Sequence, residues 1–199
     1  ILFIAAAGNN SQDNDLFPQF PANHDLMNII SVAATDSSDQ LASFSNYGPY
    51  TVDVAAPGMD ILSTLPYDRY GSYSGTSMSA PFVSGLAGLL LAHDPGLTPA
   101  QLRDRILCST DKIPELEGKI LTQGRINMHK ALTETVAGPE IFAINPDRAQ
   151  AGAQVTILGA NFQDTAGQVY FAENTTAQII SWRNDKIVCQ VPDSAQSGD

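Results

Sequence analysis

The stretch that decides the fold is Gly75-Thr76-Ser77-Met78-Ser79-Ala80-Pro81, at the head of a long apolar segment. Residues 77–93 are apolar nearly all round, a pattern that predicts a helix inside a protein. Gly75 allows a tight backbone turn before that helix and leaves space for a bound chain. The sequence therefore predicts a loop that turns into a buried helix, with Ser77 in its first turn.

Ser77 occupies a position that suits a nucleophile. Backbone N–H groups in the first turn of a helix lack partners within the helix, and together with the helix dipole they favour negative charge nearby. Acyl transfer develops such a charge beside its nucleophile. An ordinary buried helix with a serine at its start is the alternative interpretation. Position 79 is serine, so this is not a Gly-x-Ser-x-Gly elbow, which disfavours an esterase or amidase.

Apolar runs and helical patterns alternate on both sides of this stretch. Residues 1–7, 28–33 and 51–55 are continuous apolar runs that predict buried strands. Downstream, Thr98-Pro99-Ala100-Gln101 predicts the start of a helix that runs to about Cys108, and a short helix is expected over 127–135. Buried strands alternating with helices predict a mostly parallel sheet in a three-layer α/β/α arrangement, incomplete at its N-terminus.

Two motifs together resemble the subtilisin-like serine proteases. The stretch from Gly75 to Pro81 is similar to the family's signature around its nucleophile, which gives that role to Ser77. Residues 5–9, Ala-Ala-Ala-Gly-Asn, are similar to the strand end that carries the family's oxyanion-hole asparagine, which makes Asn9 an oxyanion donor. Taken alone, Asn9 would be an ordinary turn residue after a strand. The resemblance covers residues 1–135.

The resemblance also implies where substrate binds. The segment around Phe20 and Pro21 is similar to the one that lines the family's primary specificity pocket. The residues expected to contact substrate are Ala6, Ala7, Gly8, Phe20, Pro21, Gly75 and Thr76. From these we expect an endopeptidase of broad specificity that prefers large apolar side chains and hydrolyses peptide bonds through an acyl-enzyme.

Two members of the family's catalytic triad are not found in this sequence. The triad runs in the order Asp, His, Ser, so the Asp and His motifs should precede Asn9. The histidines present, His24, His93 and His129, lie outside any such motif, and we interpret them as surface or satisfied residues. We therefore expect a fragment that is inactive alone, with Asp and His upstream. The alternative is a catalytically inactive protease-like scaffold in a secreted surface-binding or adhesion protein.

The composition and net charge limit the classes of partner that this protein is expected to bind. The net charge of -11 argues against nucleic acid and anionic membrane surfaces, and residues 82–92 form an apolar stretch too short for membrane insertion. A protein or peptide substrate and a secreted or cell-surface location are expected. No cofactor is required. Residues 13–15 and 36–39 carry carboxylates that could bind structural calcium, but we prefer to interpret both segments as solvated turns. For Cys108 and Cys189, two free thiols are preferred over a disulfide.

The pattern changes at Ala137-Gly138-Pro139, and short strands with turn signals follow. They predict an all-β immunoglobulin-like sandwich, with strands expected over 141–144, 154–158, 168–171, 177–182 and 186–191. Residues 144–146, 155–162 and 187–192 resemble IPT/TIG domains. We place the peptidase domain at 1–137 and a truncated sandwich at 138–199, with a protein or surface glycan as its expected ligand. Phe162 and Trp182 are expected in its core, and Asn174 begins a glycosylation sequon.

Overall fold

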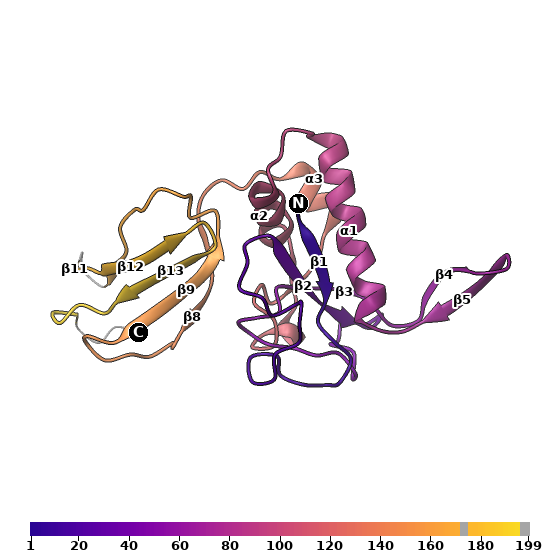
Figure 1. Ribbon diagram of the computed structural model, residues 1–199, viewed down its shortest axis with the longest axis horizontal. Coiled ribbons are helices and arrows are strands. Elements are labelled where there is room, and N and C mark those ends of the chain that lie inside the picture. The colour runs from indigo at the N-terminus through magenta and orange to yellow at the C-terminus, as the bar shows by residue number, and fades with distance from the viewer. Residues whose placement is uncertain (172–174, 196–199) are drawn as a thin grey trace. The chain divides into compact units, whose positions relative to one another are not determined.

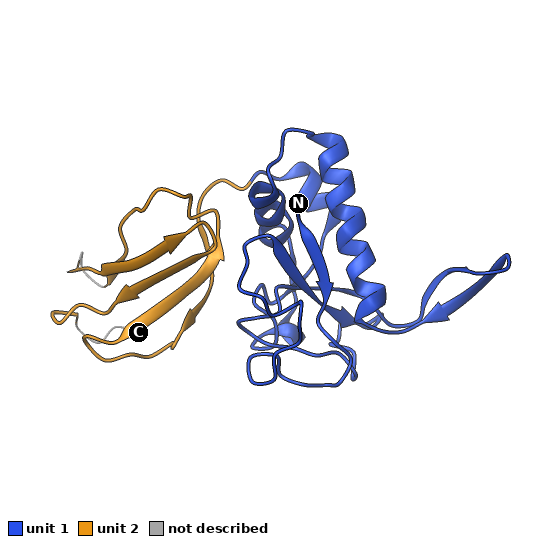
Figure 2. Cartoon of the chain, in the orientation of Figure 1, with its two compact units in different colours: residues 1–135 blue, residues 136–199 orange. Residues whose placement is uncertain are grey.

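The computed structural model describes residues 1–171 and 175–195, which divide into two compact units (Figure 2). Unit 1 comprises residues 1–135 and unit 2 residues 136–199. Asn174, the first residue of the predicted sequon, lies outside the described residues, as do the last four positions of the sandwich placed at 138–199.

Unit 1 is built on a mostly parallel sheet whose three longer strands are rich in Ile, Val and Ala. Its strands, in spatial order, are β1 (Phe3–Ala6), β2 (Ile29–Thr35), β3 (Val54–Pro57), β7 (Gly124–Arg125) and β6 (Asp111–Lys112). The first three pairings are parallel and only β6 runs antiparallel to its neighbour. Every residue of β2 is buried, as its continuous apolar run requires. This arrangement confirms the predicted α/β class.

Three α-helices and one 3-10 turn accompany the sheet. They are α1 (Thr76–His93), α2 (Pro99–Cys108), η1 (Pro114–Leu116) and α3 (Met128–Thr133). Helix α1 lies along β1, β2 and β3 (Figure 1) and buries Val83, Leu86 and Leu90. Helix α2 begins with the expected capping box between Thr98 and Gln101.

The burial of α1 differs from the prediction. Leu89 is 48% exposed and Leu91 40% exposed, although both belong to the apolar segment expected to be inside the protein. At 100° per residue, Leu89 and Leu91 lie about 100° to either side of the buried Leu90, so they stand at the two edges of the face that packs on the sheet. The helix thus buries one face and leaves the two leucines at its edges accessible.

A two-stranded hairpin that the sequence did not predict leads into α1. Strands β4 (Ile61–Leu65) and β5 (Arg69–Tyr73) pair in antiparallel fashion and project away from the sheet (Figure 1). The two ends of the hairpin segment are held together, because the N–H of Gly75 donates to the carbonyl of Gly58 at 2.7 Å. This bond fixes the residue that immediately precedes the helix.

Unit 2 is an antiparallel sandwich, as predicted. One sheet has the order β12 (Gln178–Arg183), β13 (Lys186–Gln190), β9 (Gln154–Ala160), β8 (Glu140–Asn145), and β10 (Tyr170–Phe171) pairs with β11 (Thr175–Thr176). Phe162 is buried in the core, and Trp182 packs against it with its indole N–H donating to the Gln163 carbonyl at 2.9 Å. Among the described residues, Cys108 and Cys189 are not joined to each other by a disulfide.

Candidate active site

Ser77 lies in the first turn of α1 and is exposed, between the buried Thr76 and the half-buried Met78. The residue before the helix, Gly75, has φ 157° and ψ 159°, a backbone conformation that residues with a side chain rarely adopt. Glycine at 75 therefore allows the chain to turn into the helix so that the hydroxyl of Ser77 is open to solvent.

The side chain of Asn9 reaches the start of α1. Its Oδ1 accepts hydrogen bonds from the backbone N–H of Thr76 at 2.8 Å and from the Thr76 hydroxyl at 3.0 Å. These bonds orient the carboxamide, because its oxygen faces Thr76 and its Nδ2 donors are left for another acceptor. A Cβ added to Gly75 would lie 3.4 Å from that Nδ2, which places the amide beside the residue that opens the helix. The structure thus brings Asn9 and the first turn of α1 together.

Gly8 joins β1 to this turn. Its N–H donates to the Thr76 hydroxyl at 3.2 Å, and its φ is 116°. A Cβ at this position would stand 2.5 Å from Nδ2 of Asn46, which is closer than carbon side chains approach nitrogen. Both the backbone conformation and the available space therefore require glycine at position 8.

The two alanines before Gly8 differ in accessibility. Ala6 is half-buried, whereas Ala7 is completely buried. The N–H of Ala7 donates to Val32 in β2 at 3.0 Å, and its carbonyl accepts from Nδ2 of Asn14 at 2.9 Å. Ala7 is therefore a buried support for its neighbours Ala6 and Gly8, which are also predicted to bind substrate.

Phe20 and Pro21 lie on an exposed loop. The Phe20 side chain is 67% exposed, and its ring centroid is 4.7 Å from that of His24. The loop passes close to Gly8, because a Cβ on Gly8 would be 3.5 Å from Cγ of Gln19. An exposed aromatic side chain next to the strand end is available for contact with a bound chain.

The three histidines occupy separate elements. The ring of His24 packs against that of Phe20 at a tilt of 46°, His129 belongs to α3, and His93 is the last residue of α1. Because Ser77 and His93 are sixteen residues apart on one helix, they are separated by about 24 Å. His93 therefore cannot act as the base for Ser77.

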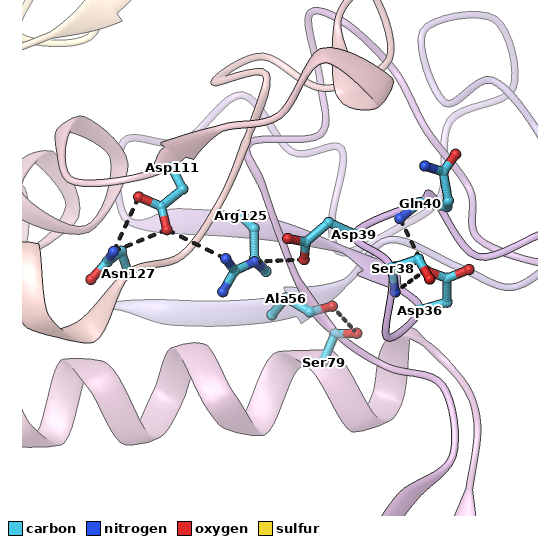
Figure 3. A network of polar contacts seen from close by, with 9 residues as sticks. All are labelled: Asp36, Ser38, Asp39, Gln40, Ala56, Ser79, Asp111, Arg125 and Asn127. Carbon is cyan, nitrogen blue, oxygen red and sulfur yellow. Dashed lines mark hydrogen bonds and ion pairs between the residues drawn. The ribbon is translucent and has the colours of Figure 1, made fainter.

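The carboxylates of the acidic turns bind groups within the protein. The carboxylate of Asp36 accepts from the N–H groups of Ser38 and Gln40 at 2.8 and 3.0 Å, while Asp39 pairs with Arg125 at 2.8 Å (Figure 3). The carboxylate of Asp15 accepts from the Thr51 hydroxyl and the Tyr50 N–H, and burial raises its pKa. Calcium needs six to eight converging oxygens, and the described residues contain no cluster of three or more acidic, histidine or cysteine side chains placed to hold a metal.

A chain of ion pairs joins β6, β7, α3 and the turn at residues 36–39. Asp111 contacts Lys130 at 2.8 Å, Arg125 at 3.3 Å and the side chain of Asn127 (Figure 3). Its hydrogen bond with Lys130 lowers the pKa of Asp111 and raises that of Lys130. Figure 3 also shows the hydroxyl of the buried Ser79 donating to the Ala56 carbonyl at 3.0 Å, which attaches α1 to β3.

Sequence reasoning gave no structural role to two buried asparagines near Gly8, since Asn14 was noted only in the acidic turn 13–15 as a possible calcium ligand and Asn46 was given no role. Both are completely buried, and their amides bond to each other at 2.9 Å. Asn46 lies inside residues 1–135, the range of the family resemblance. Its neighbours do not reveal its burial, because polar loop residues are usually exposed.

Family profiles match both units. The profile described as the Subtilase family matches residues 1–127, and that of the IPT/TIG domain matches residues 139–199. The described residues include no helix long and apolar enough to cross a bilayer.

Individual proteins are similar over unit 1. The chain is 45% identical over 130 residues to the thermophilic serine proteinase of Bacillus sp. (strain AK1), covering 65% of this chain and 30% of that protein. It is 43% identical over 105 residues to the halolysin-like extracellular serine protease Nep of Natrialba magadii, covering 53% of this chain and 18% of that protein. A solved structure from work on subtilase cytotoxin SubAB assembly is similar with a TM-score of 0.58 and 28% identity, over 66% of this chain and 48% of that one. The chain spans less than half the length of each.

Proposed function

Because this chain belongs to the subtilase family of serine proteases, we propose that it carries the nucleophile and an oxyanion donor of a secreted serine endopeptidase. Ser77 is the nucleophile and Asn9 the donor. The observation that carries the proposal is the pair of hydrogen bonds from Thr76 to Oδ1 of Asn9, at 2.8 and 3.0 Å. They direct the amide donors of Asn9 away from Thr76 while the Ser77 hydroxyl next to it in the chain stays exposed.

In the proposed reaction, Oγ of Ser77 attacks the carbonyl carbon of the scissile peptide bond. A histidine takes the hydroxyl proton, and an aspartate orients that histidine. Nδ2 of Asn9 and the backbone N–H of Ser77 donate to the oxyanion that forms. The C–N bond then breaks, the histidine gives its proton to the leaving amine, and water hydrolyses the acyl-serine. The histidine and aspartate are proposed to lie upstream in the complete protein, so this chain alone is expected to be inactive.

Substrate is proposed to bind along the strip formed by Ala6, Gly8, Gly75 and Thr76, with Phe20 and Pro21 bordering the specificity pocket. The side chains of Ala7 and Thr76 are buried, so these two residues contribute by supporting the backbone and the Asn9 side chain. An exposed phenylalanine beside a strip of small residues favours large apolar side chains in the substrate. The secreted location is supported by the similarity to a relative named as extracellular.

The proposed domain division remains 1–137 for the peptidase part and 138–199 for the sandwich. Unit 2 matches the IPT/TIG profile, and we assign it a binding role toward a protein or a surface glycan. This match is also what favours the second candidate, an inactive protease-like scaffold in an adhesion protein. The two candidates differ in whether Ser77 reacts.

The deciding experiment uses the complete protein that contains this chain. A fluorophosphonate probe is expected to label Ser77, and casein is expected to be cleaved; Ser77→Ala abolishes both. Ser84→Ala is the matched control, because Ser84 is an exposed serine on the same helix whose hydroxyl bonds to the Ala80 carbonyl at 3.1 Å. Activity that survives Ser77→Ala refutes the assignment of the nucleophile. A folded wild-type protein that neither labels nor cleaves supports the scaffold.

A further inference from the structure

We propose that the buried amide pair Asn14 and Asn46 positions Asn9 for its role as oxyanion donor. The inference rests on the proposed function, because it assigns both residues a part in the same reaction. Neither side chain is proposed to touch substrate. Each acts through the backbone on either side of Asn9.

Asn46 holds the turn that contains Asn9. It is completely buried, and its Oδ1 accepts from the N–H groups of Asn10 at 2.8 Å and Gln12 at 3.2 Å. Its own backbone N–H donates to the Gly8 carbonyl at 2.9 Å. Because Gly8 and Asn10 flank Asn9 in the chain, Asn46 sets the backbone path from which the Asn9 side chain projects.

Asn14 completes the arrangement. Its Oδ1 accepts from Nδ2 of Asn46 at 2.9 Å, and its own Nδ2 donates to the Ala7 carbonyl at 2.9 Å. It is also completely buried. The two asparagines therefore bond to backbone groups at three positions around the strand end, with the side-chain amides bonding to Ala7 and Asn10 and the backbone N–H of Asn46 bonding to Gly8.

The same pair is connected to the loop of the proposed specificity pocket. The backbone carbonyl of Asn14 accepts from Nδ2 of Asn23 at 2.9 Å, and Oδ1 of Asn23 accepts from the N–H of Gln19 at 2.9 Å. Gln19 immediately precedes Phe20. The oxyanion donor and the pocket loop thus share one set of hydrogen bonds.

An apolar residue at 46 would remove the side-chain acceptor of the Asn10 and Gln12 N–H groups and the donor to the amide oxygen of Asn14. Unpaired buried polar groups are costly, so the turn would shift until they reached water or other acceptors. Oxyanion stabilisation depends on the position of the donor to within a few tenths of an ångström. A shift of the turn is therefore expected to slow the chemical step more than it weakens substrate binding.

The test is a double-mutant cycle in the complete protein, measured well below its unfolding temperature. Active sites are titrated with a fluorophosphonate, and kcat is expressed per titrated site. Asn46→Ala is expected to lower kcat by about 10–100-fold while KM for a peptide substrate changes less than about threefold. In an Asn9→Ala background the same substitution is expected to lower kcat by less than about threefold, because the donor through which Asn46 acts is gone.

Thr122→Val is the matched control for a purely structural effect. Thr122 is also completely buried in unit 1, and its hydroxyl donates to the Asp53 carbonyl at 2.8 Å. This variant is expected to lower the melting temperature while kcat per active site stays within about twofold of wild type. If Asn46→Ala does not fold, Asn14→Ala replaces it, with an expected loss of about 3–30-fold.

The inference is overturned if the asparagine variants lose only stability, or if their effect on kcat is as large without Asn9 as with it. Failure of the proposed function has a different signature. In that case Asn9→Ala itself leaves kcat per active site unchanged, or Ser77→Ala remains active, whatever the variants at 14 and 46 do.

Discussion

Thr76 holds the side chain of Asn9 through two separate donors. The backbone N–H of Thr76 lies 2.8 Å from Oδ1 of Asn9, and its hydroxyl lies 3.0 Å from the same atom. The hydroxyl oxygen also accepts from the N–H of Gly8 at 3.2 Å. One buried residue at the start of α1 therefore contacts both the side chain and the backbone of the strand end.

Thr76→Ala is expected to lower kcat/KM of the complete protein by about 5–50-fold, because the Asn9 carboxamide loses one of its two donors and Gly8 loses its acceptor. Thr76→Ser keeps the hydroxyl and is expected to stay within about threefold of wild type. Steady-state kinetics on a peptide substrate measure both. Equal losses in the two variants would mean that the methyl group, and not the hydroxyl, matters at this position.

Gly8→Ala is expected to destabilise the protein by about 1–3 kcal/mol, since the position has φ 116° and no room for a Cβ beside Asn46. Gly85→Ala is the matched control. Gly85 is an exposed position of α1 with nothing within 4 Å of an added Cβ, so alanine there is expected to stabilise by about 0.5–1 kcal/mol. Urea unfolding of the two variants gives both values. A neutral Gly8→Ala would contradict the packing described around Asn46.

Arg103→Met is expected to destabilise the protein by about 3–5 kcal/mol, because it leaves a carboxylate without its cation in the interior. Nη2 of Arg103 lies 2.8 Å from Oδ1 of Asp53, and both side chains are largely buried. Arg69→Met removes an exposed arginine of the β4–β5 hairpin and is expected to cost less than about 1 kcal/mol. Similar unfolding midpoints in denaturant for the two variants would show that the Asp53 pair contributes little.

Asp111→Asn is expected to make the free energy of unfolding less dependent on pH in the acid range. The folded protein lowers the pKa of Asp111 from its ordinary value of 3.8, mainly through the hydrogen bond with Lys130. The stabilisation from ionised Asp111 is therefore present above pH 3.8 and is lost as pH falls through the lowered pKa. Unfolding curves recorded from neutral pH to below pH 3 compare the two proteins. Parallel curves for variant and wild type would mean that Asp111 is not coupled to folding.

The elements with strong local signals were predictable from the sequence. The Thr98 and Gln101 capping box marks the start of α2, and the apolar run around Ile30 gives β2. Ser77 was placed in the first turn of a helix, where the structure has it. These features depend on residues close together in the chain, which is why periodicity and capping patterns reveal them.

The features that depend on distant contacts were not predictable. Burial of Asn46 follows from its contacts with residues more than thirty positions earlier, and no local pattern encodes them. The β4–β5 hairpin was missed because most of its side chains are exposed, so its strands lack a buried face that would produce alternation. Exposure of Leu89 likewise depends on which segments cover α1, a property that the helix sequence does not contain.

Two residues near the start of helix α1 form hydrogen bonds to two different parts of the sheet. Thr76 bonds to the residues that follow β1, and Ser79 bonds to Ala56 in β3. A rotation of the helix about its own axis that preserved one attachment would break the other, so the direction of the Ser77 side chain is set by the sheet. The hairpin before the helix can consequently change in length or sequence without changing the direction of the Ser77 side chain. Related proteins can therefore diverge in this hairpin at little cost to catalysis.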